Sequence, residues 1–213
     1  MNAQEKVADI LLDIGAVSIN PKVPFRYTSG LLSPVYSDLR LLMSYPKERR
    51  QVIDYWVKLI KQQGKFDFIA ATATAGIPHG AWISEVMDLP MVYVRSEAKK
   101  HGKKNQVEGL VKKGKKVVIV EDLISTAKSS IETQKALKKM GARANDIVAI
   151  FSYTLPQSNK NLRAAKVRLA TLTTFPKLVE QATKNKRLSQ TDRAVVLDWL
   201  NDSVGWGERY GFE

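Results

Sequence analysis

The stretch KKVVIVEDLISTAKSS, residues 115–130, decides the fold. Its four consecutive β-branched residues, 117–120, predict a buried strand, because parallel strands covered on both faces show continuous apolar runs. Glu121 and Asp122 follow directly, and a hydroxyl-rich turn then leads into a helix that begins near Lys128. In open α/β sheets, ligands bind beyond the carboxyl ends of the strands. This stretch therefore predicts both a parallel sheet and the edge of that sheet at which a ligand binds.

The same stretch suits a sugar phosphate. A helix N-terminus presents free N–H groups and partial positive charge to a phosphate, and the turn adds several hydroxyl donors. Glu121 and Asp122 can accept hydrogen bonds from two ribose hydroxyls, or approach a metal held by the substrate. The alternative is that the acids and hydroxyls only cap the helix. Carboxylates at the end of a buried strand are costly to desolvate unless a ligand needs them, so we favour the binding site.

Helical and strand patterns alternate along the rest of the chain. We expect helices near residues 3–14, 46–63, 76–87, 128–140, 176–184 and 190–201. We expect strands at residues 68–71, 91–94, 116–120, 147–153 and 167–172. This alternation is typical of βαβ units and predicts an α/β fold with a central, mostly parallel sheet flanked by helices.

Three segments depart from this alternation. Residues 17–38 are short, turn-rich and broken by prolines, which predicts a small separate lobe. Residues 97–108, EAKKHGKKNQVE, form a basic loop between two apolar runs, and the residues alone leave open whether it is a functional lid or a solvated loop. The tail GWGERYGFE, residues 205–213, suggests an extended segment that docks by its aromatic side chains.

Composition narrows the class of protein. The chain has 213 residues, 44% of them hydrophobic and 26% charged, which suits one α/β domain with a sizeable core. It has no cysteine, so disulfides, thiolate metal sites and a cysteine nucleophile are excluded. No apolar run reaches the length of a membrane span, and the acidic N-terminal helix does not resemble a secretory signal, so we expect a cytoplasmic protein. The net charge of +13 attracts polyanions, which leaves nucleic acid, a membrane surface or a highly charged small substrate as partners.

The decisive stretch resembles the signature with which type I phosphoribosyltransferases bind phosphoribosyl diphosphate (PRPP). Three other stretches resemble the orotate phosphoribosyltransferases: YTSGLLSPVYSDLR at 27–40 their hood, ATATAGIPHG at 71–80 their pyrophosphate loop, and VRSEAKKHG at 94–102 their mobile catalytic loop. The motifs follow the family's order, and the resemblance runs from about Ala3 to Leu172. It implies a type I phosphoribosyltransferase fold as one domain over residues 1–213. The hood would come mainly from residues 15–40 with C-terminal contributions, and the core from about 45–175.

The resemblance also implies an activity. In the family's reaction, orotate and PRPP give orotidine 5'-monophosphate and pyrophosphate, a step of de novo pyrimidine (UMP) biosynthesis. Mg²⁺ would arrive with PRPP and be held mainly by its oxygen atoms, because the chain shows no metal-ligand spacing of its own. The family forms homodimers in which the catalytic loop closes over the neighbouring subunit's site. The expected partners are thus orotate, PRPP and a second copy, with no membrane and no nucleic acid.

Residue roles follow from the same resemblance. Catalytic roles fall on Lys99, His101 and Asp122. Contacts with PRPP are expected from Thr72, Ala73, Thr74, Ala75, Gly76, Arg95, Lys99, His101, Lys103, Glu121, Asp122, Leu123, Ile124, Ser125, Thr126, Ala127, Lys128 and Ser129. Contacts with orotate are expected from Thr28, Ser29, Gly30, Tyr36 and Ser125, although Tyr36 also suits a packed aromatic of the hood.

Two positions depart from the family's pattern. Ala127 and Lys128 stand where relatives usually carry glycine, which permits positive φ and close approach to phosphate. Either the turn stays in the right-handed region, or phosphate binding is weakened and Lys128 compensates with its charge. Ser96 stands where many relatives have lysine.

Two other functions remain open. One is a phosphoribosyltransferase for a purine or for uracil, against which the hood motif argues. The other is a non-catalytic regulator of the same fold that senses PRPP and binds nucleic acid through the basic runs Lys112–Lys116 and Lys135–Lys139. No helix-turn-helix or aromatic RNA-binding signature supports the regulator.

Overall fold

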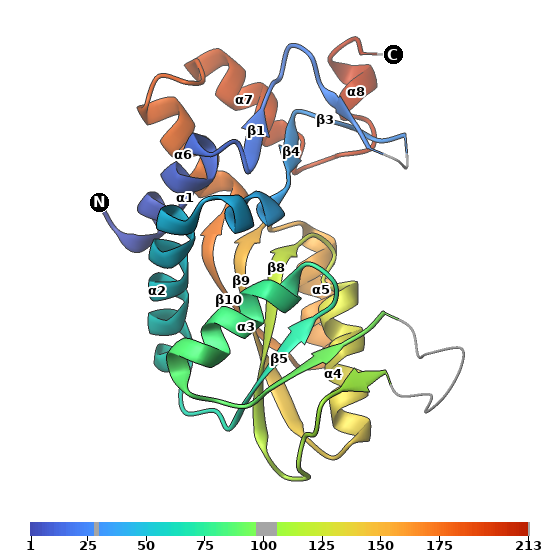
Figure 1. Ribbon diagram of the computed structural model, residues 1–213. Coiled ribbons are helices and arrows are strands. Elements are labelled where there is room, and N and C mark those ends of the chain that lie inside the picture. Colours follow the sequence, from blue (N-terminus) through green and yellow to red (C-terminus); the bar gives the residue numbers. More distant parts are fainter. Residues whose placement is uncertain (28–29, 97–105, 213) are drawn as a thin grey trace. The chain divides into compact units, whose positions relative to one another are not determined.

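The computed structural model describes residues 1–27, 30–96 and 106–212 (Figure 1). The chain divides into two compact units. Residues 47–172 form what we call the core unit, and residues 1–46 with 173–213 form the terminal unit. The decisive stretch lies in the core unit, while the terminal unit is built from both ends of the chain.

A six-stranded sheet forms the centre of the core unit, in the order β10-β9-β8-β5-β6-β7. Its strands are β5 (Phe68–Thr72), β6 (Met91–Val94), β7 (Val107–Glu108), β8 (Lys116–Ile124), β9 (Arg143–Ser152) and β10 (Arg168–Thr174). β5 pairs with β6 and β8 in parallel, and β8 pairs with β9 in parallel. The short edge strand β7 pairs antiparallel with β6. β8 is thus flanked on both sides, and its residues Val117–Val120 have no exposed surface, which explains the continuous apolar run.

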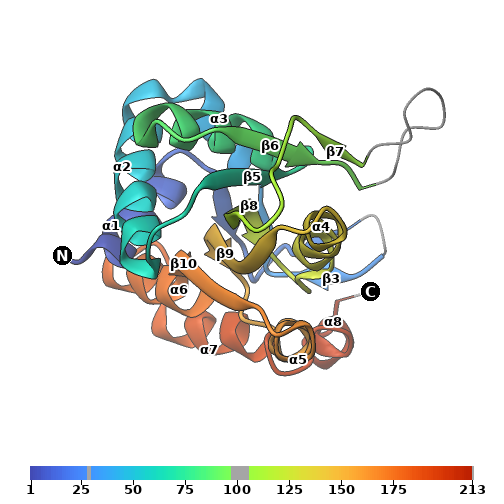
Figure 2. The ribbon, with the colours of Figure 1, turned by 90° about the horizontal axis from the view of Figure 1, so that it is seen from below.

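Four helices belong to the core unit: α2 (Pro46–Gln63), α3 (Gly76–Met87), α4 (Lys128–Lys139) and α5 (Pro156–Ala165). α3 packs on β5, β6 and β8, whereas α4 packs on β8 and β9 with α5 beside it. α3 and α4 lie on opposite faces of the sheet (Figure 2). This follows from the strand order, because the chain moves from β5 to β6 in one direction and from β8 to β9 in the other, with right-handed crossovers. The order therefore reverses between β5 and β8, and such a switch point is where open α/β sheets bind ligands.

Short elements from the two chain ends make up the terminal unit. The N-terminal part holds α1 (Ala3–Asp13), β1 (Val17–Ile19), β2 (Phe25–Arg26), β3 (Leu32–Ser33), β4 (Val35–Ser37) and the 3-10 helix η1 (Leu39–Ser44). The C-terminal part holds α6 (Phe175–Lys184), α7 (Gln190–Asp198) and α8 (Trp206–Arg209). β1 pairs antiparallel with β4, and β2 pairs antiparallel with β3. α1 packs on α6, where Gln181 and Asn185 donate hydrogen bonds to the carboxylate of Asp9.

The predicted α/β fold with a mostly parallel sheet is confirmed, with three corrections to its elements. β8 continues past Val120 to Ile124, because its far end pairs with β9. The sequence analysis also missed α5, which begins at Pro156. The tail is not extended: α8 forms there, Trp206 is buried, and its ring stacks on Phe212 with 5.4 Å between centroids. In the described part of the chain, no helix combines the length and apolar character that crossing a bilayer requires.

Candidate functional site

Two loops flank the switch point of the core unit. Residues 73–75 join β5 to α3, and residues 125–127 join β8 to α4. Gly76, the first residue of α3, lies close to β8, since a Cβ at this position would lie 2.9 Å from the main-chain oxygen of Val120. α3 therefore begins in direct contact with β8, and only a residue without a side chain allows that approach.

Ala127 adopts a backbone conformation that usually requires glycine. Its φ is 63°, in the left-handed region, which excludes the alternative in which this turn stays right-handed. The residue is only 5% exposed, and its main-chain oxygen accepts a hydrogen bond of 3.0 Å from the N–H of Ile131. Packing on the sheet and the first turn of α4 hold the alanine in this conformation, at an intrinsic cost of about 1–2 kcal/mol.

The start of α4 has no side-chain cap among the residues that the structure describes. By contrast, Thr174 and Ser189 cap α6 and α7 with their hydroxyls. The interpretation in which the hydroxyls of residues 125–129 only cap the helix is therefore wrong for α4. Ser125 and Ser129 are exposed, so their hydroxyls and the first N–H groups of α4 are available to an anion.

A residue that the sequence analysis missed supports this loop. Asn161, on α5, donates a hydrogen bond of 2.8 Å from Nδ2 to the main-chain oxygen of Thr126. In the sequence, helix α5 is indicated by Pro156, because proline suits the first turn of a helix and here marks its start. The contact itself joins residues 35 positions apart, so no local pattern predicts it.

The two acids of β8 lie in different environments. Glu121 is 6% exposed, and its Oε2 accepts a hydrogen bond of 2.9 Å from the hydroxyl of Ser130. Burial, and then the negative charge of Asp122, raise the pKa of Glu121 to about 8. Asp122 itself is half-buried. Of the two acids, Glu121 is therefore the one whose protonated form burial favours.

A cavity of about 230 Å³ brings the predicted PRPP residues of three segments together. Its lining comprises Thr72, Ala73, Val94, Arg95, Ser96, Lys128, Ser129, Glu132 and Thr133. The loop beyond β5 is held to β6 at this point, because the N–H of Ala73 donates to the oxygen of Val94 at 2.8 Å. The Ala73–Thr74 peptide bond is cis. Arg95 and Lys128 give the cavity two cations, which suits a polyphosphate.

Comparison with known proteins assigns the family. Residues 42–187 match the model of the phosphoribosyl transferase domain. An orotate phosphoribosyltransferase of Coxiella burnetii is 46% identical over 207 residues, which cover 97% of this chain and 99% of the relative. The chain belongs to the orotate phosphoribosyltransferase family.

Solved structures of the family resemble the chain in three dimensions. An orotate phosphoribosyltransferase of Aeropyrum pernix matches with a TM-score of 0.75 and 27% identity, over 84% of this chain and 98% of its own. The UMP synthase of Leishmania donovani matches with a TM-score of 0.79 and 29% identity, over 94% of this chain and 42% of its own. The type I phosphoribosyltransferase fold expected from the motifs is therefore confirmed.

Several residues assigned by family resemblance lie outside the described residues: Thr28, Ser29, Lys99, His101 and Lys103. Gly30 and Tyr36 belong to the terminal unit. Tyr36 is 45% exposed, and its ring centroid lies 5.6 Å from that of Phe25, so it packs as an aromatic of this unit. Contact of these residues with orotate stays a prediction.

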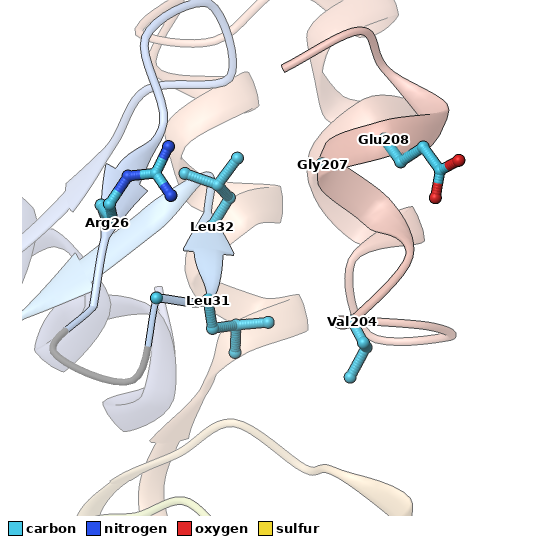
Figure 3. Close-up of a pocket in the computed structure, with 7 residues that line it drawn as sticks. Arg26, Leu31, Leu32, Val204, Gly207 and Glu208 are labelled. Carbon is cyan, nitrogen blue, oxygen red and sulfur yellow. The ribbon is translucent and has the colours of Figure 1, made fainter. Parts of the chain in front are cut away.

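Gly30 lines a cavity of about 510 Å³ in the terminal unit, formed together with Arg26, Leu31, Leu32, Val204, Gly207 and Glu208 (Figure 3). Leu31 and Leu32 project from the β2–β3 hairpin beside the C-terminal segment that carries Val204 and Gly207. Leu32 is in close contact with Gly207, where a Cβ would lie 2.9 Å from Cδ1 of the leucine. The end of the chain thus packs against β3, which belongs to the stretch that resembles the hood motif.

Proposed function

We propose that the chain transfers the phosphoribosyl group of PRPP to N1 of orotate. The N1–C1' bond forms as the bond between C1' and the pyrophosphate oxygen breaks. The pyrophosphate leaves with the electron pair of that bond, the N1 proton of orotate is released, and the other product is orotidine 5'-monophosphate. The observation that carries this proposal is the switch point of the core unit. There an uncapped helix start, two acids and a cavity with two cations adjoin one another. The family to which the chain belongs supports orotate as the acceptor.

The loop of residues 125–129 holds the 5'-phosphate. The first N–H groups of α4 and the hydroxyls of Ser125 and Ser129 donate hydrogen bonds to it, and the left-handed Ala127 lets the main chain turn towards it. Asp122 accepts hydrogen bonds from the ribose hydroxyls. Fixing the sugar in this way places C1' in line between the acceptor and the leaving group, which is the main contribution that positioning makes to such a transfer.

The cavity beside β5 receives the pyrophosphate. Arg95 and Lys128 line it and offset the negative charge that grows on the leaving group. Lys128 therefore supplies a charge close to the position at which Ser96 lacks the lysine of many relatives. By family resemblance, Lys99, His101 and Lys103 add charge from the catalytic loop, and closure of that loop excludes water that would hydrolyse PRPP.

Mg²⁺ enters the proposal as an ion that PRPP brings. In the described part of the chain, no group of three histidine or acidic side chains could hold a metal, and Glu121 is buried, with its pKa raised by that burial. The donor set thus fits an ion held by phosphate and ribose oxygens. When bound, it neutralises part of the charge of the pyrophosphate.

Orotate binding, assembly and location complete the proposal. Thr28, Ser29, Gly30, Tyr36 and Ser125 contact orotate, on the strength of the hood motif. Two copies form a homodimer that shares the catalytic loop, and the enzyme works in the cytoplasm. Sedimentation equilibrium would measure the assembly, and a monomer at active concentrations would contradict the homodimer.

A parallel activity assay tests the function. The chain is incubated with PRPP and Mg²⁺ and with orotate, uracil, adenine or hypoxanthine, and nucleotide products are separated by chromatography. We expect turnover with orotate alone, its loss on adding EDTA and its return with excess Mg²⁺. Turnover of another base, or salt-dependent binding of nucleic acid without turnover of any base, would contradict the proposal.

A further inference from the structure

Four buried polar side chains form one hydrogen-bonded cluster beneath the site. Thr72, Glu121, Ser130 and Thr133 are 4%, 6%, 1% and 2% exposed. Thr133 Oγ1 donates to Thr72 Oγ1 at 3.2 Å, and Ser130 Oγ donates to Glu121 Oε2 at 2.9 Å. Thr72 and Glu121 directly follow the paired residues Ala71 and Val120 of β5 and β8, and the hydrogen bond of the Thr72 side chain to the Glu121 carboxyl, which lowers the pKa of that carboxyl, joins the two halves. The chain Thr133–Thr72–Glu121–Ser130, which we call the hydroxyl cluster, therefore links α4, β5 and β8.

The hydroxyl cluster occupies buried positions that apolar side chains could fill at a lower cost in free energy. The layer below it, between α4 and the sheet, is apolar and includes Ala70, Ile119 and Ile131. Burying polar groups costs free energy unless every group finds a partner, and a well-packed apolar core avoids that cost. A fully bonded polar cluster does, however, fix one arrangement of its members, because hydrogen bonds are directional and strong where water is excluded.

Three members of the hydroxyl cluster adjoin segments that the proposed function assigns to PRPP. Thr72 is the last residue of β5 and precedes the loop at Ala73. Glu121 precedes Asp122, and Ser130 lies in the first turn of α4, directly after Ser129. The cluster therefore connects the pyrophosphate loop, the ribose acid and the phosphate-binding helix start.

We infer that the hydroxyl cluster sets the distance between the pyrophosphate and ribose-phosphate halves of the site, so that its members act as positioning residues for PRPP. This inference rests on the proposed function. It gives the Thr72 hydroxyl a different role from direct contact with substrate, because that hydroxyl is engaged in the core. PRPP must bind both halves at once, so a small change in their spacing weakens its binding. Orotate needs only one end of the site.

Variants that remove a hydroxyl but keep the shape test this inference. Thr72→Val, Thr133→Val and Ser130→Ala each delete one link, and Thr72→Ser keeps the link while removing a methyl group. Ser158→Ala is the matched control, because Ser158 is also 1% exposed and bonded at 2.7 Å, but to Leu155 on α5. For each variant, KM for PRPP, KM for orotate and kcat are measured, together with the Kd of PRPP by calorimetry.

We expect Thr72→Val and Ser130→Ala to raise KM and Kd for PRPP about tenfold, the effect of losing one buried hydrogen bond. KM for orotate should stay within about twofold, and Thr72→Ser and Ser158→Ala should keep PRPP affinity near that of the unsubstituted chain. The double variant Thr72→Val/Ser130→Ala should lose less affinity than the product of the two single losses, because both break one chain of bonds.

Unchanged PRPP affinity in the three deletion variants would overturn the inference, as would an equal rise in both KM values. If Thr72→Val does not fold, Thr133→Val and Ser130→Ala decide the matter, because both substitute positions within helix α4. Calorimetry separates failure of this inference from failure of the proposed function, because it measures PRPP binding without turnover. A chain that binds PRPP but does not convert orotate would contradict the function while the affinities of the variants still test the cluster.

Discussion

Ala127 is the residue at which this chain departs from the glycine-rich loops of its family. Its φ of 63° shows that the loop keeps a left-handed residue without glycine. Substitution by glycine would relieve strain of about 1–2 kcal/mol. It would also remove a buried methyl group that contributes about 0.8 kcal/mol to stability. Glycine would further raise the conformational entropy of the unfolded chain, which lowers stability by about 0.5–1 kcal/mol. These effects nearly cancel, so the alanine is tolerated rather than disabling.

Ala127→Gly should therefore change the free energy of unfolding by less than about 1 kcal/mol and PRPP affinity by less than about threefold. Ala127→Val should destabilise the protein by about 2 kcal/mol or more, because a β-branched residue is a genuine outlier at positive φ. Urea unfolding and PRPP titration measure both effects. A large gain in affinity from glycine would show that the native loop is impaired.

His79 is a buried histidine that has no role in the proposed reaction. It is 1% exposed, and neither ring nitrogen has a hydrogen-bond partner among the described residues. Its ring lies between those of Trp56 and Trp82, with centroids 5.6 Å away in each case. Burial, and then the charge of Arg49, lower its pKa to about 4. The folded protein therefore holds this imidazole neutral.

This gives stability a pH dependence. Above pH 6.5 the imidazole is neutral in both the folded and the unfolded protein. Below pH 6.5 the unfolded chain binds a proton at His79, whereas the folded protein does not bind one until the pH falls to about 4. The free energy of unfolding is therefore about 2 kcal/mol lower at pH 5 than at pH 7.5. His79→Leu should remove that part of the loss, as measured by urea unfolding at both pH values. An equal loss in the variant would mean that His79 titrates normally in the folded state.

At the scale of elements, α2 was predicted well, because the periodicity that places its apolar residues in the core is local. α2 and α3 have the predicted bounds. The end of β8 was not predicted, because pairing with β9 extends it through Asp122, where the sequence turns polar. The hydroxyl cluster escaped prediction for a similar reason: the bond between Thr72 and Thr133 joins residues 61 positions apart.

The contact between α3 and β8 gives a prediction at this scale. Gly76→Ala would place a methyl 2.9 Å from the main-chain oxygen of Val120, so the helix start must shift away from the acid pair. We expect a loss of about 2 kcal/mol of stability and at least tenfold weaker PRPP binding, although alanine favours the helix by about 1 kcal/mol. Ala81→Gly is the control, since this exposed position of α3 should show only the propensity cost. A Gly76→Ala variant with unchanged PRPP affinity would contradict the close contact between the start of α3 and β8.

At the scale of the whole molecule, the two ends of the chain meet in the terminal unit. Trp199 donates a hydrogen bond of 3.0 Å from its indole N–H to the main-chain oxygen of Leu32, across 167 positions. The turn signals of residues 17–38 predicted a separate lobe, but nothing local indicated which distant segment completes it. The aromatic residues of the tail predicted docking, and only the contact with β3 shows where the tail docks.

Trp199→Phe should release this link. The ring contact with Phe175 would remain in part, but the Leu32 oxygen would lose its donor, at a cost of about 1 kcal/mol. Hydrogen exchange should therefore quicken in both β3 and α7. Trp206→Phe is the comparison, because its indole bonds Val195 within the C-terminal part, so exchange should quicken mainly there and less in β3, which α8 also contacts. Equal effects of the two variants on β3 would contradict the link.

The central claim is that residues 121–129 hold the sugar phosphate. The most direct test is a crystal structure of the complex with orotidine 5'-monophosphate. We predict the 5'-phosphate within hydrogen-bond distance of main-chain N–H groups of residues 126–129, with Asp122 on the ribose hydroxyls. A nucleotide whose phosphate binds elsewhere, leaving the start of α4 without an anion, would contradict the account.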